Sequence, residues 1–474
     1  MGEEQMAGKS AQYSSGEASF FTRDKSFYRQ VFSIFSMVAL QNLVAYSVNM
    51  IDNVMMGSYS QTSLSGAATV NQIFFLVQQT SIAVCDAYII LASQYYGQGR
   101  MSPVRKIAGL ALKLGLGCGL FFALVCGLFP VQLLRFFTRD EAIIGQGRLY
   151  MQIILFTFPL FVLTNVMMAA LRCVGTVKIS FYISVVSLII NTCINYTLIF
   201  GHFGFPEMGI RGAAIGTLTA RSVELVIVLL YIRFRDQKLQ LFSENFLSCS
   251  RQLAVDFLRV AAPVIMAGLL WAVSVPMQTA ILGHLPGPDA SDAIAANSVA
   301  TTFYQYLKVV VRAMASATAV VMGQTVGRGD MQRIKSDART FSVLNLCVGI
   351  VLAVILFILR GPLLSRYSLT PNAMRLADQI MIVMCFVMVG MAYQMPVSNG
   401  VLRGSGDTKF SLILNTVSVW GIVMPLSLLA AFVWRLPVPL VVLCIQSDQI
   451  FKGLPIFLRV RSGKWIRHLT RDEV

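Results

Sequence analysis

The sequence predicts an all-α membrane protein with twelve transmembrane helices, in two six-helix bundles that are related by a pseudo-twofold axis and surround a central cavity. Three observations lead to this prediction. First, 56% of the 474 residues are hydrophobic and only 13% are charged, with a mean hydropathy of +0.69, which is typical of polytopic membrane proteins. Second, the apolar residues form twelve segments that are long enough to cross a bilayer as helices. Third, motifs of the first half of the chain return in the second half.

The twelve apolar segments are separated by short polar connections and by one longer polar connection at residues 234–254. Their expected ranges are 32–57, 65–94, 106–134, 145–171, 178–200, 209–233, 255–283, 292–323, 340–359, 373–400, 410–433 and 437–458. The longer connection leaves six segments on each side. We therefore expect an N-lobe at residues 31–233, a cytoplasmic linker at 234–254 and a C-lobe at 255–460. Cytoplasmic tails are expected at residues 1–30 and 461–474.

Lys and Arg residues concentrate in every second connection, whereas the connections at 58–64 and 284–291 contain none. By the positive-inside rule, this alternation predicts that both termini are cytoplasmic. The net charge of +16 is explained by the same distribution, so we expect the basic surface to face anionic lipid rather than nucleic acid. The expected location is a bacterial cytoplasmic membrane, and the expected state is a monomer.

Two motif pairs recur about 230 residues apart. Ser93–Gly99 reads SQYYGQG and Gly323–Gly329 reads GQTVGRG, while Leu171–Lys178 reads LRCVGTVK and Leu402–Lys409 reads LRGSGDTK. Because each half holds an even number of segments, both halves have the same orientation, and their pseudo-twofold axis should lie along the membrane normal. This architecture suits alternating access to a central cavity. Four glycines of the first pair are expected to permit tight cytosolic turns: Gly97, Gly99, Gly327 and Gly329.

A carboxylate lies deep in the first apolar segment. At about 100° per residue, Asp52 shares one helical face with the amide side chains of Gln41 and Asn49. A carboxylate in hydrocarbon costs at least about 2.5–3.5 kcal/mol, so it should face protein or a water-filled cavity. We interpret Asp52 as a cation or proton site, and the alternative is a structural Asp bound to neighbouring amides.

Further polar residues lie inside the N-terminal segments. Asn191 and Asn195 are four residues apart and share a helical face, where their alternative role is interhelical packing. Arg221 and Glu224 are expected to form a structural ion pair. Asp86 is either a second titratable site or the partner of a basic residue across the cavity.

In the C-terminal half, Lys308 and Arg312 lie four residues apart and far from either end of their segment, and no acid of that half is expected at a matching depth. They could snorkel or cap backbone carbonyls, pair with Asp52 or Asp86, or bind an anionic group of the substrate. We predict that they line the cavity together with other polar and aromatic side chains, although aromatic residues at helical spacing more often pack. The predicted lining is Gln41, Asn49, Trp271, Gln278, Tyr304, Lys308, Arg312, Tyr393, Asn399 and Asn415.

The sequence offers no chemistry for an enzyme. It contains no HExxH motif and no His/Asp or Ser/Lys dyad, and its nine cysteines and three histidines show no metal-ligand spacing. We therefore expect no catalytic residue, no bound metal and no cofactor.

Taken in order, the motifs resemble those of the MATE (multidrug and toxic compound extrusion) transporters, within the wider multidrug/oligosaccharidyl-lipid/polysaccharide exporter superfamily. The resemblance runs from Gln41 to about Arg461, and its carriers are Ile51–Gly57, Ser93–Gly99, Leu171–Gly201, Gly209–Glu224 and Leu402–Lys409. It implies a secondary antiporter that exports amphipathic small molecules in exchange for H⁺ or Na⁺. A lipid-linked oligosaccharide flippase and an exporter of anionic or zwitterionic metabolites are the alternatives.

The resemblance also implies a coupling site. Similar MATE proteins build an N-lobe cation site from an Asp of the first helix, a pair of residues in the fifth and a Thr of the sixth. By position these are Asp52, Asn191, Asn195 and Thr217. Some members have an acid where Asn195 stands, so this chain has one negative charge fewer at the site, which weakens the expectation of Na⁺ over H⁺.

Overall fold

The computed structural model describes residues 21–471 except 244, 247, 285–289 and 368. Most of these residues are helical, and there is no β-strand among them. Ten helices are long and apolar enough to cross a membrane, and the number rises to twelve if each of two bent helix pairs is one span. The predicted all-α fold with up to twelve spans is therefore confirmed.

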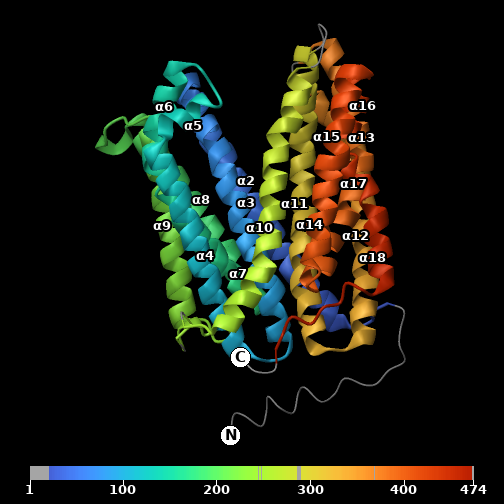
Figure 1. Cartoon of the computed structure of the whole chain (residues 1–474). Coiled ribbons are helices and arrows are strands. Elements are labelled where there is room, and N and C mark those ends of the chain that lie inside the picture. Colours follow the sequence, from blue (N-terminus) through green and yellow to red (C-terminus); the bar gives the residue numbers. More distant parts are fainter. Residues whose placement is uncertain (1–20, 244, 247, 285–289, 368, 472–474) are drawn as a thin grey trace.

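The first half of the chain forms the N-lobe, coloured blue to green in Figure 1. Its last spans are α8 and α9, and its fourth span is bent by 50° between α6 and α7. Its elements are α2 (Lys25–Tyr59), α3 (Gln61–Gly97), α4 (Met101–Leu128), α5 (Pro130–Arg135), α6 (Glu141–Ile154), α7 (Thr157–Cys173), α8 (Lys178–Phe200), η1 (His202–Gly204) and α9 (Ile210–Phe234).

The second half forms the C-lobe, coloured yellow to red. It follows a connection that contains η2 (Leu241–Ser243), and its last span is bent by 43°. Its elements are α10 (Arg251–Gly283), α11 (Ala290–Arg328), α12 (Met331–Leu364), α13 (Pro371–Pro396), η3 (Val397–Leu402), α14 (Thr408–Thr416), η4 (Val417–Val423), α15 (Met424–Leu428), η5 (Leu429–Val433), α16 (Val438–Ile445), α17 (Asp448–Phe451) and α18 (Gly453–Ser462).

The first helix begins at Lys25, seven residues earlier than the apolar segment predicted. The side chain of Asp24 caps it by accepting a hydrogen bond from the Ser26 backbone N–H at 2.8 Å. Such a cap satisfies an N–H group that would otherwise lack a partner, and so a helix can begin within a polar segment.

The apolar core shows how the lobes meet. One buried cluster fills the N-lobe and continues into one end of the C-lobe, where Val326, Phe341 and Leu402 belong to it. A second buried cluster, between Ile281 and Ile445, lies only in the C-lobe. The helices of the two lobes accordingly converge at one end and diverge toward the other (Figure 1).

The SQYYGQG and GQTVGRG motifs form the contact at the convergent end, which we call the motif end. A Cβ atom on Gly97 of α3 would lie 2.2 Å from the carbonyl oxygen of Gln324, and one on Gly327 of α11 would lie 2.0 Å from that of Gln94. Because Gln94 and Gln324 occupy equivalent positions, this contact is reciprocal, as a twofold relation requires. Gly99 and Gly329 have φ angles of 77° and 79° and end the helices as expected.

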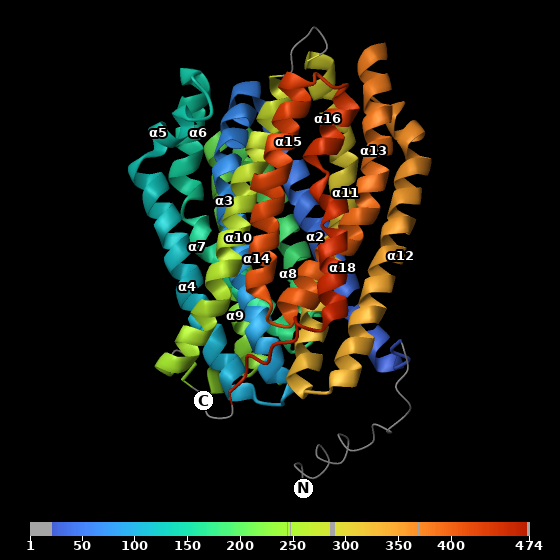
Figure 2. The ribbon, with the colours of Figure 1, turned by 45° about the vertical axis from the view of Figure 1, so that its right-hand side comes forward.

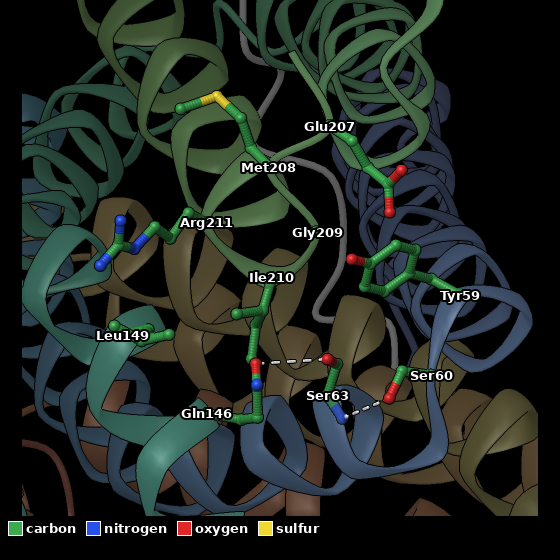
Figure 3. Close-up of a pocket in the computed structure, with 10 residues that line it drawn as sticks. All are labelled: Tyr59, Ser60, Ser63, Gln146, Leu149, Glu207, Met208, Gly209, Ile210 and Arg211. Carbon is green, nitrogen blue, oxygen red and sulfur yellow. Dashed lines mark hydrogen bonds between the residues drawn. The ribbon is translucent and has the colours of Figure 1, made fainter.

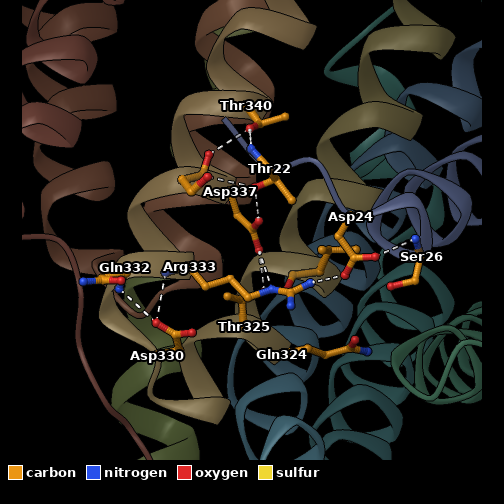
Figure 4. A network of polar contacts seen from close by, with 12 residues as sticks. Thr22, Asp24, Ser26, Gln324, Thr325, Asp330, Gln332, Arg333, Asp337 and Thr340 are labelled. Carbon is orange, nitrogen blue, oxygen red and sulfur yellow. Dashed lines mark hydrogen bonds and ion pairs between the residues drawn. The ribbon is translucent and has the colours of Figure 1, made fainter. Parts of the chain in front are cut away.

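Segments from both ends of the chain also cross between lobes here. Before α2, the Thr22 N–H donates to Thr340 Oγ1 at 2.9 Å and the Thr22 hydroxyl donates to Asp337 Oδ1 at 2.5 Å, so the chain is tied to α12 (Figure 4). Arg333 of α12 binds Asp24 at 2.7 Å. After α18, the Leu469 N–H donates to the side-chain oxygen of Gln94 at 2.9 Å.

We predict that Gly97→Ala or Gly327→Ala separates the lobes at the motif end. The added methyl group must retreat from about 2 Å to ordinary van der Waals contact of about 3.5–4 Å, so the lobes should move apart by at least about 1 Å. Spin labels at the exposed, equivalent positions Lys178 and Lys409, in a cysteine-free background, would report longer distances in double electron–electron resonance.

Gly117→Ala provides the matched control, because a Cβ on this α4 glycine would meet no atom within 4 Å. Its distribution of label distances should equal that of the spin-labelled protein with Gly117 unchanged. An unchanged distribution in both Gly97→Ala and Gly327→Ala would show that the reciprocal contact does not hold the lobes together.

Candidate functional site

The four residues predicted to form a cation site lie together on three helices of the N-lobe. The Asn195 amide of α8 donates to Asp52 Oδ1 of α2 at 2.6 Å, and it lies 3.3 Å from Asn191 Oδ1. The Asn191 amide in turn lies 3.4 Å from the hydroxyl of Thr217 on α9. A continuous chain of hydrogen bonds therefore joins the carboxylate to both amides and the hydroxyl.

Local sequence explains how α9 approaches α8 so closely. A Cβ atom on Gly216 would lie only 2.0 Å from Asn195 Oδ1, so only glycine leaves room for this amide. Asn191 and Asn195 are both buried, at 1% and 0% exposure. Asn195 Oδ1 has no hydrogen-bond partner among the described residues. A buried acceptor oxygen without a donor is costly, and it lies beside the carboxylate.

The oxygen atoms of this cluster suit a hard cation. Asp52 supplies a carboxylate, the asparagines supply amide oxygens, and Thr217 supplies a hydroxyl. Oxygen ligands of this kind bind alkali and alkaline-earth cations, and a carboxylate alone can instead take a proton. The arrangement can therefore exchange one positive charge at a time.

Two further groups lie close to the carboxylate. Arg221 forms the expected ion pair with Glu224 at 2.8 Å, and its guanidinium lies 5.1 Å from the centre of the Phe161 ring. It also interacts electrostatically with Asp52, so the pair belongs to the surroundings of the site. Tyr150 of α6 is buried and interacts electrostatically with Asp52. No signal in the sequence identified Tyr150, because its helix is amphipathic and otherwise unremarkable in composition.

A cavity of about 550 Å³ lies at the divergent end of the N-lobe (Figure 3). Tyr59 lines it two helical turns beyond Asp52 on α2, and Gln146 lines it one turn beyond Tyr150 on α6. The Ser63 hydroxyl donates to the Gln146 side-chain oxygen at 3.3 Å within the lining. Its remaining lining residues are Ser60, Leu149, Glu207, Met208, Gly209, Ile210 and Arg211. The cavity therefore shares α2 and α9 with the carboxylate cluster and lies nearer their divergent ends.

Asp86 of α3 lies at the boundary between the lobes. It interacts electrostatically with Arg172, Arg312 and Arg403, which come from three other segments. Arg172 and Arg403 are the equivalent arginines of the two LRxxGxxK motifs, and Arg172 also donates to the Ser316 hydroxyl at 2.9 Å. Of the two alternatives that the sequence left open for Asp86, this arrangement matches the partner of basic residues.

The predicted cavity residues do not form one cluster. The Lys308 ammonium lies 5.4 Å from the centre of the Trp271 ring. Tyr304 is buried with its hydroxyl 3.0 Å from the Met391 sulfur, and Asn415 accepts a hydrogen bond from Lys452 at 2.9 Å. The Gln41 amide donates a hydrogen bond to the Met168 sulfur at 3.6 Å. Five of the predicted residues have exposed or half-buried side chains: Gln41, Asn49, Gln278, Tyr393 and Asn399.

The expectation that no acid of the C-lobe lies near Lys308 was wrong. Asp448, only 4% exposed, interacts electrostatically with Lys308 and forms a 2.7 Å ion pair with the equally buried Lys452. The break between α16 and α17 brings this pair into the C-lobe interior, where Gly390 allows the backbone to approach. The spacing of four residues between Asp448 and Lys452, inside an apolar segment, was the signal that could have revealed it.

Comparison with known proteins agrees with this fold. The MatE family model matches residues 38–197 and 263–429. The chain is 25% identical over 438 residues to "Probable multidrug resistance protein NorM" of Thermotoga maritima, covering 92% of each chain. It is 24% identical over 370 residues to "Probable multidrug resistance protein YoeA" of Bacillus subtilis, covering 77% of this chain and 78% of that one.

Solved structures with low sequence identity share the fold. The bent form of the Vibrio cholerae MATE transporter VcmN superposes with a TM-score of 0.81 at 18% identity, over 92% of this chain and 97% of that one. A MOP superfamily transporter from Pyrococcus furiosus, described by the phrase "Reverse polarity of binding pocket suggests different function", has a TM-score of 0.82 at 16% identity, over 93% and 98%. Since the family model spans most of both lobes, the chain belongs to the MatE family of membrane transporters and is not an enzyme.

Proposed function

We propose that this protein exports amphipathic small molecules across a bacterial cytoplasmic membrane in exchange for H⁺ or Na⁺, and that Asp52 is the coupling residue. The names of its bacterial relatives support multidrug export. The observation that carries the assignment of Asp52 is its hydrogen-bonded link to Asn195, whose second polar atom is buried without a partner. No catalytic residue or cofactor takes part, and a monomer suffices, because both lobes belong to one chain.

The orientation follows from charge. Basic residues cluster in the connections at the motif end, so this end faces the cytoplasm by the positive-inside rule. Both chain termini then belong to the cytoplasmic side. The cavity beside Tyr59 then faces outward, two helical turns beyond Asp52 on α2.

Coupling follows from the low dielectric around Asp52. When the carboxylate is charged and empty, the Asn195 amide holds it against α8. Arrival of a cation or proton from outside neutralises the charge, weakens this bond and changes the packing of α2. A change of about 4 kcal/mol shifts a two-state equilibrium by about a thousandfold. The affinity of the protein for its substrate falls, and the substrate leaves to the outside. The two lobes then rotate relative to each other and open the cytoplasmic side.

We predict that Asp52→Asn abolishes gradient-driven export, because a neutral amide cannot change charge when a cation binds. The protein should still reach the membrane at normal levels. Asp378→Asn is the matched control, since this carboxylate is 41% exposed and pairs with Arg360 on the surface. Both variants are tested in inverted membrane vesicles, where export appears as substrate uptake driven by an imposed proton or sodium gradient. Export by Asp52→Asn at the normal rate would contradict the proposal.

The coupling ion can be identified in proteoliposomes. We expect an added substrate to drive counterflow of either protons or sodium ions, followed by an internal pH dye or by ²²Na⁺. Neither movement should occur in vesicles that contain Asp52→Asn. Substrate flux without movement of either ion would rule out this antiport.

We further predict that Gly216→Ala destabilises the protein by about 1–3 kcal/mol, the usual cost of overpacking a core. Its methyl group would displace the Asn195 amide from Asp52. Gly117→Ala, which adds a methyl group where no atom lies within 4 Å, should be neutral or slightly stabilising. Thermal unfolding in detergent compares the two, and equal melting temperatures would show that Asn195 is not held in place by Gly216.

A further inference from the structure

Three polar residues on α11 share one helical face in the middle of the membrane. Lys308, Arg312 and Ser316 recur every four residues along this 39-residue helix. With a rise of 1.5 Å per residue, Lys308 lies about 27 Å from one end of the helix and about 30 Å from the other. Most of α11 is buried within the protein, so these cations cannot be explained by contact with lipid headgroups at the membrane surface.

Neither cation has a close partner in the part of the chain that the structure describes. Lys308 and Arg312 are half-buried, and neither forms a hydrogen bond or an ion pair with a described residue. Each interacts with a carboxylate only at longer range, Lys308 with Asp448 and Arg312 with Asp86. Partly desolvated charges that form no hydrogen bond or ion pair with the described residues are costly inside a membrane, which indicates a functional role.

The surrounding charges do not balance. Asp448 is already paired with Lys452 at 2.7 Å, so it is largely neutralised. Asp86 then remains as the carboxylate shared among Arg312 and the two motif arginines, Arg172 and Arg403. Arg403 is 9% exposed and its Nε atom has no hydrogen-bond partner among the described residues. Positive charge therefore exceeds negative charge at the boundary between the lobes.

An aromatic wall adjoins the cations. Trp271 of α10 lies beside the Lys308 ammonium, and its ring centre is 6.1 Å from that of Phe75 on α3. The two rings belong to different lobes. A little nearer the motif end, α10 packs on α3 where Gly268 approaches Ala83 and Gln79. An apolar surface contributed by both lobes thus stands next to a site with excess positive charge.

We propose that Lys308 and Arg312 form a subsite for the anionic group of an amphipathic organic anion, with Trp271 and Phe75 against its apolar body. The ligand replaces the long-range attraction of Asp86 with direct charge-assisted hydrogen bonds to Arg312. This inference rests on the proposed export function and names its substrate class.

The test uses three probes with one ring system and different charge. Naphthalene-1-sulfonate, 1-naphthalenemethanol and 1-naphthylmethylammonium are titrated by calorimetry into the purified full-length protein in uncharged detergent. We expect the sulfonate to bind at least about tenfold more tightly than the other two, which corresponds to one charge-assisted contact. Its affinity should fall as salt is raised. Equal or tighter binding of the ammonium probe would overturn the proposal.

Variants separate the subsite from a structural role. Lys308→Met and Arg312→Gln should each weaken sulfonate binding by about tenfold and leave the alcohol unchanged. Lys335→Met, at an exposed lysine of α12, is the matched control and should change nothing. Asp86→Asn removes the competing carboxylate and should tighten sulfonate binding severalfold. Damage to packing would not tighten binding, so weaker binding in Asp86→Asn would contradict the assignment.

Two further arms identify what fails. Asp52→Asn imitates the neutralised carboxylate, so it should bind the sulfonate more weakly but keep the preference for it over the other two probes. If this variant also retains export, the coupling proposal fails and the subsite stands. If the unsubstituted protein shows no preference for the sulfonate while its export depends on Asp52, the subsite proposal alone is overturned. Farnesyl diphosphate tests a lipid source of the anion. Its binding in the absence of any sulfonate binding would assign the cations to a lipid diphosphate and overturn the small-molecule assignment.

Discussion

The backbone contact between α3 and α11 is the constraint on which the two-lobed structure depends. Gly97 and Gly327 each lie against the main chain of the other helix, and any side chain there would push the helices apart. Main-chain contact leaves no flexible group that could adjust, so the lobes meet at a fixed distance. The apolar core is continuous across this end and divided elsewhere. Motion between the lobes at this end must therefore disturb a main-chain contact.

Charges inside the bilayer are arranged in three ways, with different consequences. Asp448 and Lys452 form a buried ion pair beside the bend of the last span. Asp52 is held by neutral donors from Asn195 and so can change charge without a basic partner in contact. Asp86 faces more cations than it can balance. A buried pair mainly fixes a structure, whereas an unbalanced charge creates affinity for an ion or a ligand.

Much of this fold could be predicted from sequence, because spans and repeats leave direct patterns in hydrophobicity and in motifs. Asp52, Asn191 and Asn195 stood out because polar side chains are rare in apolar segments, whereas their grouping with Thr217 came from the family resemblance. Tyr150 was not predictable, because it comes from an amphipathic helix. All four motif glycines were expected in tight turns; Gly99 and Gly329 are found there, whereas Gly97 and Gly327 form the contact between the lobes. Which glycine faces the other lobe depends on helix phase and packing, and neither is encoded in a motif alone.

The N-terminal anchor gives α2 a mechanical role. The residues just before this helix are bonded to α12 of the C-lobe through Thr22 and Asp24, while Asp52 near its other end is bonded to α8 of the N-lobe. Figure 2 shows α2 running between α8 and α11, and it contacts both. About 42 Å of rigid helix separates the two attachments. A tilt of α2 at the carboxylate would therefore act on the C-lobe through the helix itself, without a relay of side chains.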